Sequence, residues 1–329
     1  MEMKKLTTLA LCLLAVLTVA AQTTFTVKGT AHATAKSLQM GDMTGKTQPQ
    51  TIKVENGQFT TTISNVPEQT FMTIVDRDNR MQSFFIVDGT EVNVDMNTDI
   101  LTGSSLNVKL SDLMQQLSTV ETEKAMQTVM RKAIDENKDN VIGAFALSQL
   151  MYFMSYEELK AELESGAPYL QHPLCDQAKQ QLKSLELRAP GTMFKDIVEN
   201  DTTGVSHHLS EYVGKGDYVL VDFWASWCGP CMQEMPNVKA NYEKYKGKGF
   251  KVVGLSFDRN ADAWKKAIRE HYLNWIHLSD LKFWQTVAAE TYGIRSIPSS
   301  ILCDPTGKIV DIDLRGEKLG AKLMEIYGE

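Results

Sequence analysis

The feature that most constrains this chain of 329 residues is a continuous apolar run, YVLVDFWA over residues 218–225, followed closely by WCGPC at residues 227–231. An uninterrupted apolar run of this length is typical of a strand buried on both faces. Proline is well tolerated at the start of a helix, because the N–H that it lacks would be unpaired there anyway. We therefore expect a strand, two cysteines and a helix, in that order.

This arrangement predicts a reactive cysteine pair. Unpaired N–H groups and the helix dipole favour a thiolate at a helix start, so Cys228 in the first turn should have a lowered pKa. A zinc site would need further ligands, and no candidate has suitable spacing. Those candidates are His207, His208, Cys175 and Cys303. A structural disulfide across two residues would close little chain and add little stability. We therefore favour a redox-active Cys228–Cys231 disulfide over a metal site or a structural link.

The rest of the C-terminal part, residues 188–329, alternates strand-like and helix-like segments. Apolar strands are predicted at residues 250–258, 299–304 and 308–314. Helices are predicted at residues 261–271 and 318–327. Alternation of this kind predicts an α/β domain, with a central mixed sheet flanked by helices. Within the predicted strand 299–304, Cys303 alternates with core residues and is expected to be a buried thiol.

The N-terminal two-thirds shows two other patterns. Residues 22–104 contain short β-prone runs, with turn signals at Asn56-Gly57 and Asp88-Gly89 that are typical of hairpins. They predict a small antiparallel β domain, arranged as a sandwich. Residues 105–187 have helical spacing and form a predicted helical connector. In that connector, Ser155 and Glu158 are spaced as a capping box.

The first 21 residues resemble a cleaved signal peptide. Lys4 and Lys5 precede an apolar run that ends in small residues, so cleavage is expected after Ala21. The run is shorter than the roughly 20 residues of a spanning helix. Lipid anchoring at Cys12 is disfavoured because Leu11 stands where a small residue is expected. We therefore expect a soluble protein of the periplasm.

Composition excludes some functions. The formal net charge is −7 and the sequence has no basic block, which disfavours nucleic-acid binding. Cleavage after Ala21 would remove Cys12, and the cysteines left are too few for a disulfide-stapled scaffold. We expect neither a metal nor another cofactor. The oligomeric state is left open.

A family resemblance rests on VDFWASWCGPC at residues 221–231, followed by Glu234, Ile297-Pro298 and the turn at residues 304–308. These residues resemble the thioredoxin superfamily. More narrowly, they resemble exported thiol-disulfide oxidoreductases of the TlpA-like and cytochrome c maturation type. Residues 22–104 are similar to the DUF4369 module that precedes such domains, on pattern alone.

The resemblance implies a role for each matching residue. Cys228 would attack a substrate disulfide, and Cys231 would then release the reduced substrate. Asp222, on the strand before the pair, would be a buried carboxylate of raised pKa that takes the proton from Cys231. Glu234 would tune the pair. The substrate-binding residues implied are Trp227, Ile297 and a cis Pro298.

The sequence also departs from the family pattern. Many thioredoxins pair the buried carboxylate with a lysine on the next strand, and none occurs near Gly254. A peroxiredoxin would have threonine three residues before its reactive cysteine, and Ala225 occupies that position, which disfavours peroxidase activity. A Gly-Pro dipeptide between the cysteines is the choice of thioredoxin, a reductant.

The predicted function is therefore reduction of disulfides in exported proteins, with a membrane thiol-transporting reductant as electron donor. Two alternatives stay open. One is reduction of apocytochrome thiols during cytochrome c maturation. The other is a binding or docking module with secondary thiol chemistry.

Overall fold

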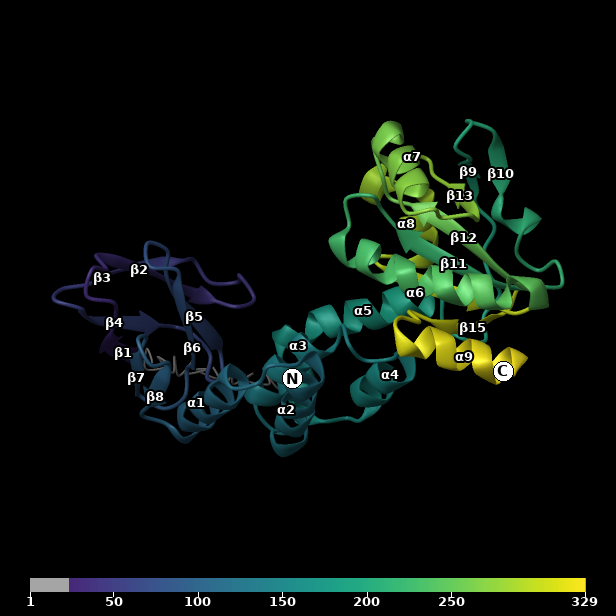
Figure 1. The fold of residues 1–329 in the computed structure, drawn as a ribbon. Coiled ribbons are helices and arrows are strands. Elements are labelled where there is room, and N and C mark those ends of the chain that lie inside the picture. Colours follow the sequence, from purple (N-terminus) through teal and green to yellow (C-terminus); the bar gives the residue numbers. More distant parts are fainter. Residues whose placement is uncertain (1–23, 329) are drawn as a thin grey trace, which may run out of the picture. The chain divides into compact units, whose positions relative to one another are not determined.

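The structure, a computed structural model, describes residues 24–328 (Figure 1). The predicted signal peptide, residues 1–21, lies outside the described residues. The chain divides into two compact units, one up to Ala146 and one from Leu147 onward. The boundary between the units falls inside the predicted helical connector, and the predicted domain boundaries stay predictions. Across residues 24–328, every helix is too short or too polar to cross a membrane.

The first unit is built on two four-stranded sheets with the orders β4-β1-β7-β8 and β3-β2-β5-β6. Its strands are β1 (Thr24–Thr30), β2 (Ser37–Asp42), β3 (Gln50–Lys53), β4 (Gln58–Ser64), β5 (Phe71–Asp76), β6 (Met81–Ile86), β7 (Glu91–Asp95) and β8 (Ile100–Thr102). Phe25 of β1 stacks on Phe85 of β6, with ring centroids 6.2 Å apart, so side chains of the two sheets share a core. The predicted β-rich region is confirmed, but its sheets are not wholly antiparallel, since β1 and β7 pair in parallel.

The two turn signals do not form the hairpins that the sequence suggested. Asn56 and Gly57 both have positive φ and form a tight turn closed by paired backbone hydrogen bonds between Glu55 and Gln58. The flanking strands β3 and β4 nevertheless belong to different sheets, and so do β6 and β7 around Asp88-Gly89. The prediction of hairpins was wrong because a turn motif fixes a local reversal, whereas long-range pairing decides which sheet each strand joins.

The helical region contains five α-helices. They are α1 (Ser105–Ser118), α2 (Glu123–Glu136), α3 (Val141–Leu150), α4 (Tyr156–Glu164) and α5 (Asp176–Glu186). The predicted capping box is confirmed at α4, where the Ser155 and Glu158 side chains each accept a hydrogen bond from the other residue's backbone N–H. In the second unit, α5 is fixed by Arg188, whose guanidinium donates to the carbonyl oxygens of Tyr292 and Gly293 at 3.1 and 3.2 Å.

The second unit contains the predicted α/β domain. Its five-stranded sheet has the order β13-β12-β11-β14-β15. The strands are β11 (Tyr218–Trp224), β12 (Phe250–Ser256), β13 (Ile276–Leu278), β14 (Ser299–Cys303) and β15 (Ile309–Ile312). Strands β11, β12 and β13 are parallel, whereas β14 and β15 pair antiparallel. The predicted mixed sheet is confirmed.

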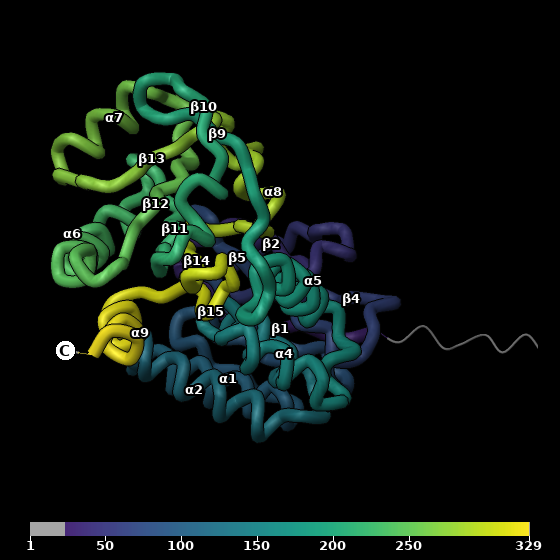
Figure 2. Tube along the Cα trace, turned by 90° about the vertical axis from the view of Figure 1, so that its right-hand side faces the viewer, coloured from purple at the N-terminus to yellow at the C-terminus, as the bar shows by residue number. Residues whose placement is uncertain are grey.

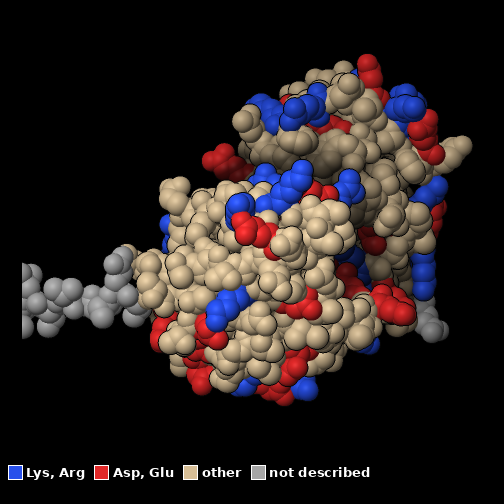
Figure 3. All heavy atoms as spheres, turned by 90° about the vertical axis from the view of Figure 1, so that its left-hand side faces the viewer, with Lys and Arg blue, Asp and Glu red and all other residues tan. Residues whose placement is uncertain are grey.

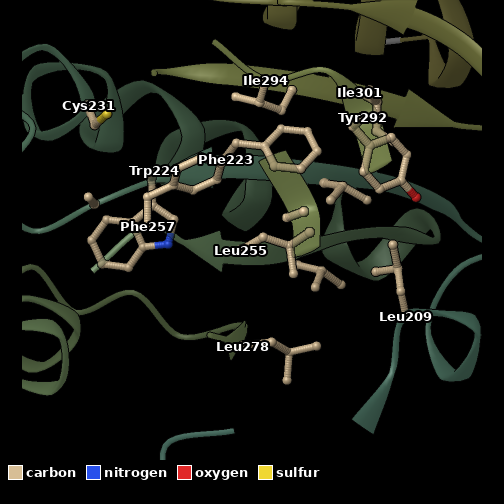
Figure 4. Close-up of a cluster of buried hydrophobic side chains, with 14 of the residues drawn as sticks. Leu209, Phe223, Trp224, Cys231, Leu255, Phe257, Leu278, Tyr292, Ile294 and Ile301 are labelled. Carbon is tan, nitrogen blue, oxygen red and sulfur yellow. The ribbon is translucent and has the colours of Figure 1, made fainter. Parts of the chain in front are cut away.

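Helices cover both faces of this sheet (Figures 1 and 2). They are α6 (Gly229–Tyr245), α7 (Ala261–Glu270), α8 (Val287–Tyr292) and α9 (Glu317–Tyr327). On one face, Leu220 of β11 packs with Val238 of α6 and Leu319 of α9. On the other face, Phe223 lies in the larger cluster with Trp264 of α7. Figure 4 shows this larger cluster, with Cys231 beside it.

Several short elements of this unit were not predicted. They are β13, α8 and a small hairpin of β9 (Val198–Asn200) and β10 (Ser206–His208). Segments of this length carry too few residues for a clear hydrophobic period.

Figure 3 shows side chains of both charge signs interspersed on the face in view.

Candidate active site

The cysteine pair lies where β11 gives way to α6. Cys228 is the N-cap residue of α6, and its sulfur forms a disulfide with Cys231 of 2.03 Å. Cys228 thus lies one position before the first helical residue, whereas the prediction placed it in the first turn, and Cys231 lies inside the helix just after Pro230. Cys228 is 5% exposed and Cys231 is 1% exposed, so both are buried and Cys228 is the more accessible of the two. The N–H of Cys231 lies 3.2 Å from the Cys228 sulfur.

Asp258 holds the loop in front of the pair, and this residue was not predicted. Its two carboxylate oxygens accept hydrogen bonds from the N–H and the hydroxyl of Ser226, at 2.9 and 2.5 Å. Asp258 lies two residues after the end of β12, which runs parallel to β11, and the carboxyl ends of parallel strands meet at one edge of the sheet. A polar residue at the end of the predicted strand 250–258 was the signal that could have identified it.

Asp222 is buried on β11, as predicted, on the sheet face that packs against α6. Burial raises the pKa of its carboxyl to about 7, the negative charge of Glu234 adds to the rise, and Arg315 opposes it. Within residues 24–328, one of its oxygens has no hydrogen-bond partner. An unpaired carboxyl with this pKa can both take up and give back a proton near neutral pH.

Glu234 of α6 lies near Asp222, since its charge contributes to the raised pKa of that group. One oxygen of Glu234 accepts hydrogen bonds from the N–H of Gly316 at 2.9 Å and from the Asn237 amide at 2.6 Å. These contacts link the helix that carries the cysteines to the start of α9. The structure therefore brings Glu234 close to the buried carboxyl rather than leaving it as a free surface residue.

The Ile297-Pro298 peptide bond is cis, the isomer that the resemblance implied. Pro298 is buried, and Ile297 is half-buried against the cluster that contains both cysteines. Directly after Pro298, the Asp313 carboxylate accepts hydrogen bonds from the hydroxyl of Ser299 at 2.5 Å and from the N–H of Ser300 at 3.2 Å. The structure thus places Ile297 against the same apolar cluster that contains both cysteines.

The missing lysine has a steric explanation. Gly254 pairs directly with Asp222 across β11 and β12. A side chain there would begin 2.7 Å from Nδ1 of His277 and 2.8 Å from the indole nitrogen of Trp224. Burial lowers the pKa of His277 to about 3, so this imidazole is neutral near pH 7. The aromatic pair fills the space that a lysine would need.

Trp227 lies beside the pair and is 46% exposed. Its ring contacts Phe283 and Trp284, with centroid distances of 5.0 and 6.2 Å. These two residues were not predicted as part of the site. Their only sequence signal is the adjacent pair of aromatic residues in a polar stretch.

The candidates that the sequence disfavoured as zinc ligands have separate surroundings. Cys303 is a free buried thiol, as expected, and burial raises its pKa to about 12. Cys175 is also free and buried, with its pKa raised to about 11. The adjacent histidines have separate partners, since His207 contacts Glu211 at 2.9 Å and His208 contacts Asp196 at 2.8 Å.

A Cys-Gly-Pro-Cys disulfide at the start of a helix, on this mixed sheet, defines a thioredoxin-like domain. Comparison with known proteins agrees with this class. Residues 190–312 match the AhpC/TSA family. Thiol-disulfide oxidoreductase ResA of Bacillus thuringiensis subsp. konkukian is 33% identical over 135 residues, which cover 40% of this chain and 72% of that protein. ResA of Bacillus subtilis is 27% identical over 122 residues, which cover 37% of this chain and 65% of that protein.

The chain therefore belongs to the thiol-disulfide oxidoreductase family that includes ResA, and it is itself a thiol-disulfide oxidoreductase. Among solved structures, the thioredoxin domain of a thiol-disulfide oxidoreductase from Bacteroides vulgatus is 38% identical and covers 43% of this chain and 99% of that chain, with a TM-score of 0.40. The family match lies at residues 190–312, and the resemblance of residues 22–104 to DUF4369 stays a prediction.

Proposed function

We propose that this oxidoreductase is exported to the periplasm and reduces disulfides in other exported proteins through Cys228 and Cys231. The observation that carries the proposal is the cysteine pair at the start of α6, with Cys228 the more exposed of the two and a buried carboxyl of raised pKa on the preceding strand. The predicted signal peptide supports export. The Gly-Pro dipeptide supports reduction, since thioredoxin has a potential near about −270 mV and the oxidant DsbA near about −120 mV.

The reaction begins with the reduced pair. The Cys228 thiolate attacks one sulfur of the substrate disulfide, a bond forms between those two sulfurs, and the other substrate sulfur leaves as a thiolate that takes up a proton. The helix N-terminus stabilises the Cys228 thiolate before the attack. The product of this step is a mixed disulfide between the chain and its substrate.

The second step releases the substrate. Asp222 takes the proton from the Cys231 thiol, and the resulting thiolate attacks the Cys228 sulfur. The bond between Cys228 and the substrate breaks, and the substrate leaves with its second thiol. Two electrons have then passed from the pair to the substrate, and the pair is again a disulfide. A membrane thiol-transporting reductant is the proposed donor that restores the dithiol.

Trapping the mixed disulfide tests this function. In a Cys231→Ala variant the second step cannot occur, so substrates should accumulate on Cys228 and separate from it on reduction. The matched control is a Cys228→Ala, Cys231→Ala double variant, which should trap none. Exported proteins captured only by the single variant would support the proposal. An equal yield from both variants would contradict it and favour a binding module with secondary thiol chemistry.

The same experiment addresses cytochrome c maturation, the alternative that the family resemblance supports. Apocytochromes with Cys-x-x-Cys-His haem sites should dominate the captured proteins if that is the main role. A broad set of unrelated disulfide proteins would instead support a general reductase. The two outcomes are distinguished by the identity of the trapped proteins, which mass spectrometry determines.

A further inference from the structure

An exposed aromatic surface lies directly beside the reactive cysteine. Trp227, Phe283 and Trp284 contact one another, with ring centroids between 5.0 and 6.2 Å apart, and are called the aromatic platform below. Trp227 is 46% exposed and Trp284 is 38% exposed. Large aromatic rings are usually buried. Two exposed indole rings beside a reactive cysteine are therefore typical of a surface that binds another molecule.

The platform is held in place from the core side. The ring of Trp284 packs edge-on against the buried Phe257, with centroids 5.3 Å apart. The guanidinium carbon of Arg259 lies 3.9 Å from the centroid of Phe283. The exposed rings therefore have fixed positions before any partner binds, which lowers the entropic cost of binding one.

The segment that carries Phe283 and Trp284 contains two residues in a disfavoured backbone conformation. Leu281 and Phe283 have φ of 57° and 58°, a region that residues with a Cβ seldom adopt. Its ends are tied down, since Asp280 accepts a hydrogen bond from the N–H of Val287 at 3.1 Å and Thr286 donates one to the buried Glu199 at 2.9 Å. Disfavoured backbone conformations concentrate at functional sites, because the surrounding structure must maintain them. Here that conformation brings the two rings to Trp227.

We propose that the aromatic platform binds a large apolar side chain next to the cysteine of the substrate, so that the chain prefers disulfides in unfolded or partly folded protein segments. This inference rests on the proposed reductase function. Trp227 directly precedes Cys228, whose sulfur must bond to the substrate sulfur. The platform therefore adjoins the surface that the substrate must cover when its sulfur bonds to Cys228.

The geometry and charge of this edge specify the partner further. A neighbouring residue in an extended segment lies about 3.3 Å along from the cysteine, so its side chain can reach rings that adjoin the pair. In a folded protein such a side chain is usually buried, whereas in an unfolded segment it is free to bind. Arg259 adds positive charge beside the platform, so a lysine next to the cysteine should be the poorest partner.

The test compares three peptide disulfides that are identical except for phenylalanine, serine or lysine beside the cysteine. The full chain is reduced with dithiothreitol, freed of it, and mixed with each peptide, and the second-order rate constant of oxidation is measured. We expect the phenylalanine peptide to react about tenfold faster than the serine peptide, a gain equal to about 1.4 kcal/mol, and the lysine peptide to be slowest. In Trp284→Ala, the rate constant for the phenylalanine peptide should fall toward about two times that for the serine peptide.

Two further variants serve as controls. Trp284→Tyr keeps an aromatic ring and should retain most of the preference. Tyr272→Ala removes an aromatic residue that is 68% exposed in the same unit and lies outside the site, and it should leave all three rates as they are. If Trp284→Ala does not fold by circular dichroism, Phe283→Leu, which keeps an apolar side chain but loses the ring, takes its place.

The outcomes separate this inference from the proposed function. Equal rates for the phenylalanine and serine peptides with the unaltered chain would overturn the role of the platform while leaving the reductase intact. A Trp284→Ala or Phe283→Leu variant that slows all three peptides equally would also overturn it. Failure of the reduced chain to react with any of the three would instead count against the reductase function.

Discussion

Two cysteine-bearing regions of the same unit have opposite chemistry. Cys228 caps α6 and is 5% exposed, with the N–H of Cys231 3.2 Å from its sulfur. Cys303 lies within β14, fully buried among apolar side chains, and burial raises its pKa to about 12. The side chain is the same in both places. We attribute the difference to position: a backbone N–H lies at the Cys228 sulfur at the start of a helix, whereas Cys303 is enclosed within a sheet.

The largest expected effect concerns activity. Replacing Cys228 with serine should reduce the rate of insulin reduction at least about 10³-fold, because the attacking sulfur is lost. Cys303→Ser should stay within about twofold of the unaltered chain. The turbidity of reduced insulin in the presence of dithiothreitol measures both. A large loss of activity in Cys303→Ser, with the fold intact, would contradict the contrast between a reactive Cys228 and an inert Cys303.

The buried Asp222 carboxyl should also lower the free energy of unfolding, by an amount that depends on pH. The pKa of Asp222 is about 7 in the folded chain and about 3.8 when unfolded. Below about pH 3 the carboxyl is protonated in both states, so its burial does not lower the free energy of unfolding. As the pH rises toward 7, only the unfolded state loses the proton, so the folded state becomes less favoured.

Asp222→Asn removes this ionisation and should therefore be more stable than the unaltered chain at pH 8, by on the order of 4 kcal/mol. At pH 4 the gain should largely disappear. Urea unfolding of the oxidised proteins at both pH values measures the difference. A gain of the same size at both pH values would show that Asp222 is not the titrating group.

The same substitution should slow the release of substrate. Without a group to take the proton from Cys231, the second step should fall by roughly 10²-fold, in line with the loss of a general base. In the unaltered chain this step should speed up as the pH rises through about 7, because Asp222 must be ionised to accept the proton. Rapid-quench measurement of the mixed disulfide follows it. A release rate with the same pH dependence in both proteins would rule out Asp222 as the base.

Cys303 should matter for stability instead of activity. Cys303→Ser places a hydroxyl among apolar side chains, which costs roughly 1–3 kcal/mol without a hydrogen-bond partner. Cys303→Ala would leave a small cavity and no polar group, so it is the matched control and should cost less. Chemical unfolding of both variants gives the comparison. If Cys303→Ser lowered the free energy of unfolding no more than Cys303→Ala, the surroundings of Cys303 would be more polar than its buried position indicates.

The smallest expected effect concerns Glu234. Its charge helps to raise the pKa of Asp222, so Glu234→Gln should lower that pKa and move the pH midpoint of substrate release downward by a fraction of a unit. At pH 6 release should then be a few-fold faster. A Gln233→Glu variant adds a charge one position away on the exposed side and serves as the control. An upward shift of the midpoint in Glu234→Gln would contradict the electrostatic role of this residue.

The sequence predicted the core of the site because those residues are close together along the chain. The strand of residues 218–225, the cysteines and the following helix form one local unit, and the observed β11 and α6 differ from it by little. The family resemblance added Pro298, whose cis bond cannot be derived from sequence patterns. The absence of a lysine beside Asp222 was also foreseen, although its cause, the packing of Trp224 and His277 at Gly254, was not.

By itself, the sequence thus determined a strand–Cys-Gly-Pro-Cys–helix unit, a mixed α/β domain and the chemistry of a thiol pair. Tertiary structure alone decided that Asp258 holds the loop before the pair and that Phe283 and Trp284 join Trp227. It also decided that the strands around the Asn56-Gly57 turn belong to different sheets. The physical reason is the same throughout. Local sequence sets backbone preference and reactivity, whereas contacts between distant segments depend on how the whole chain buries its apolar surface.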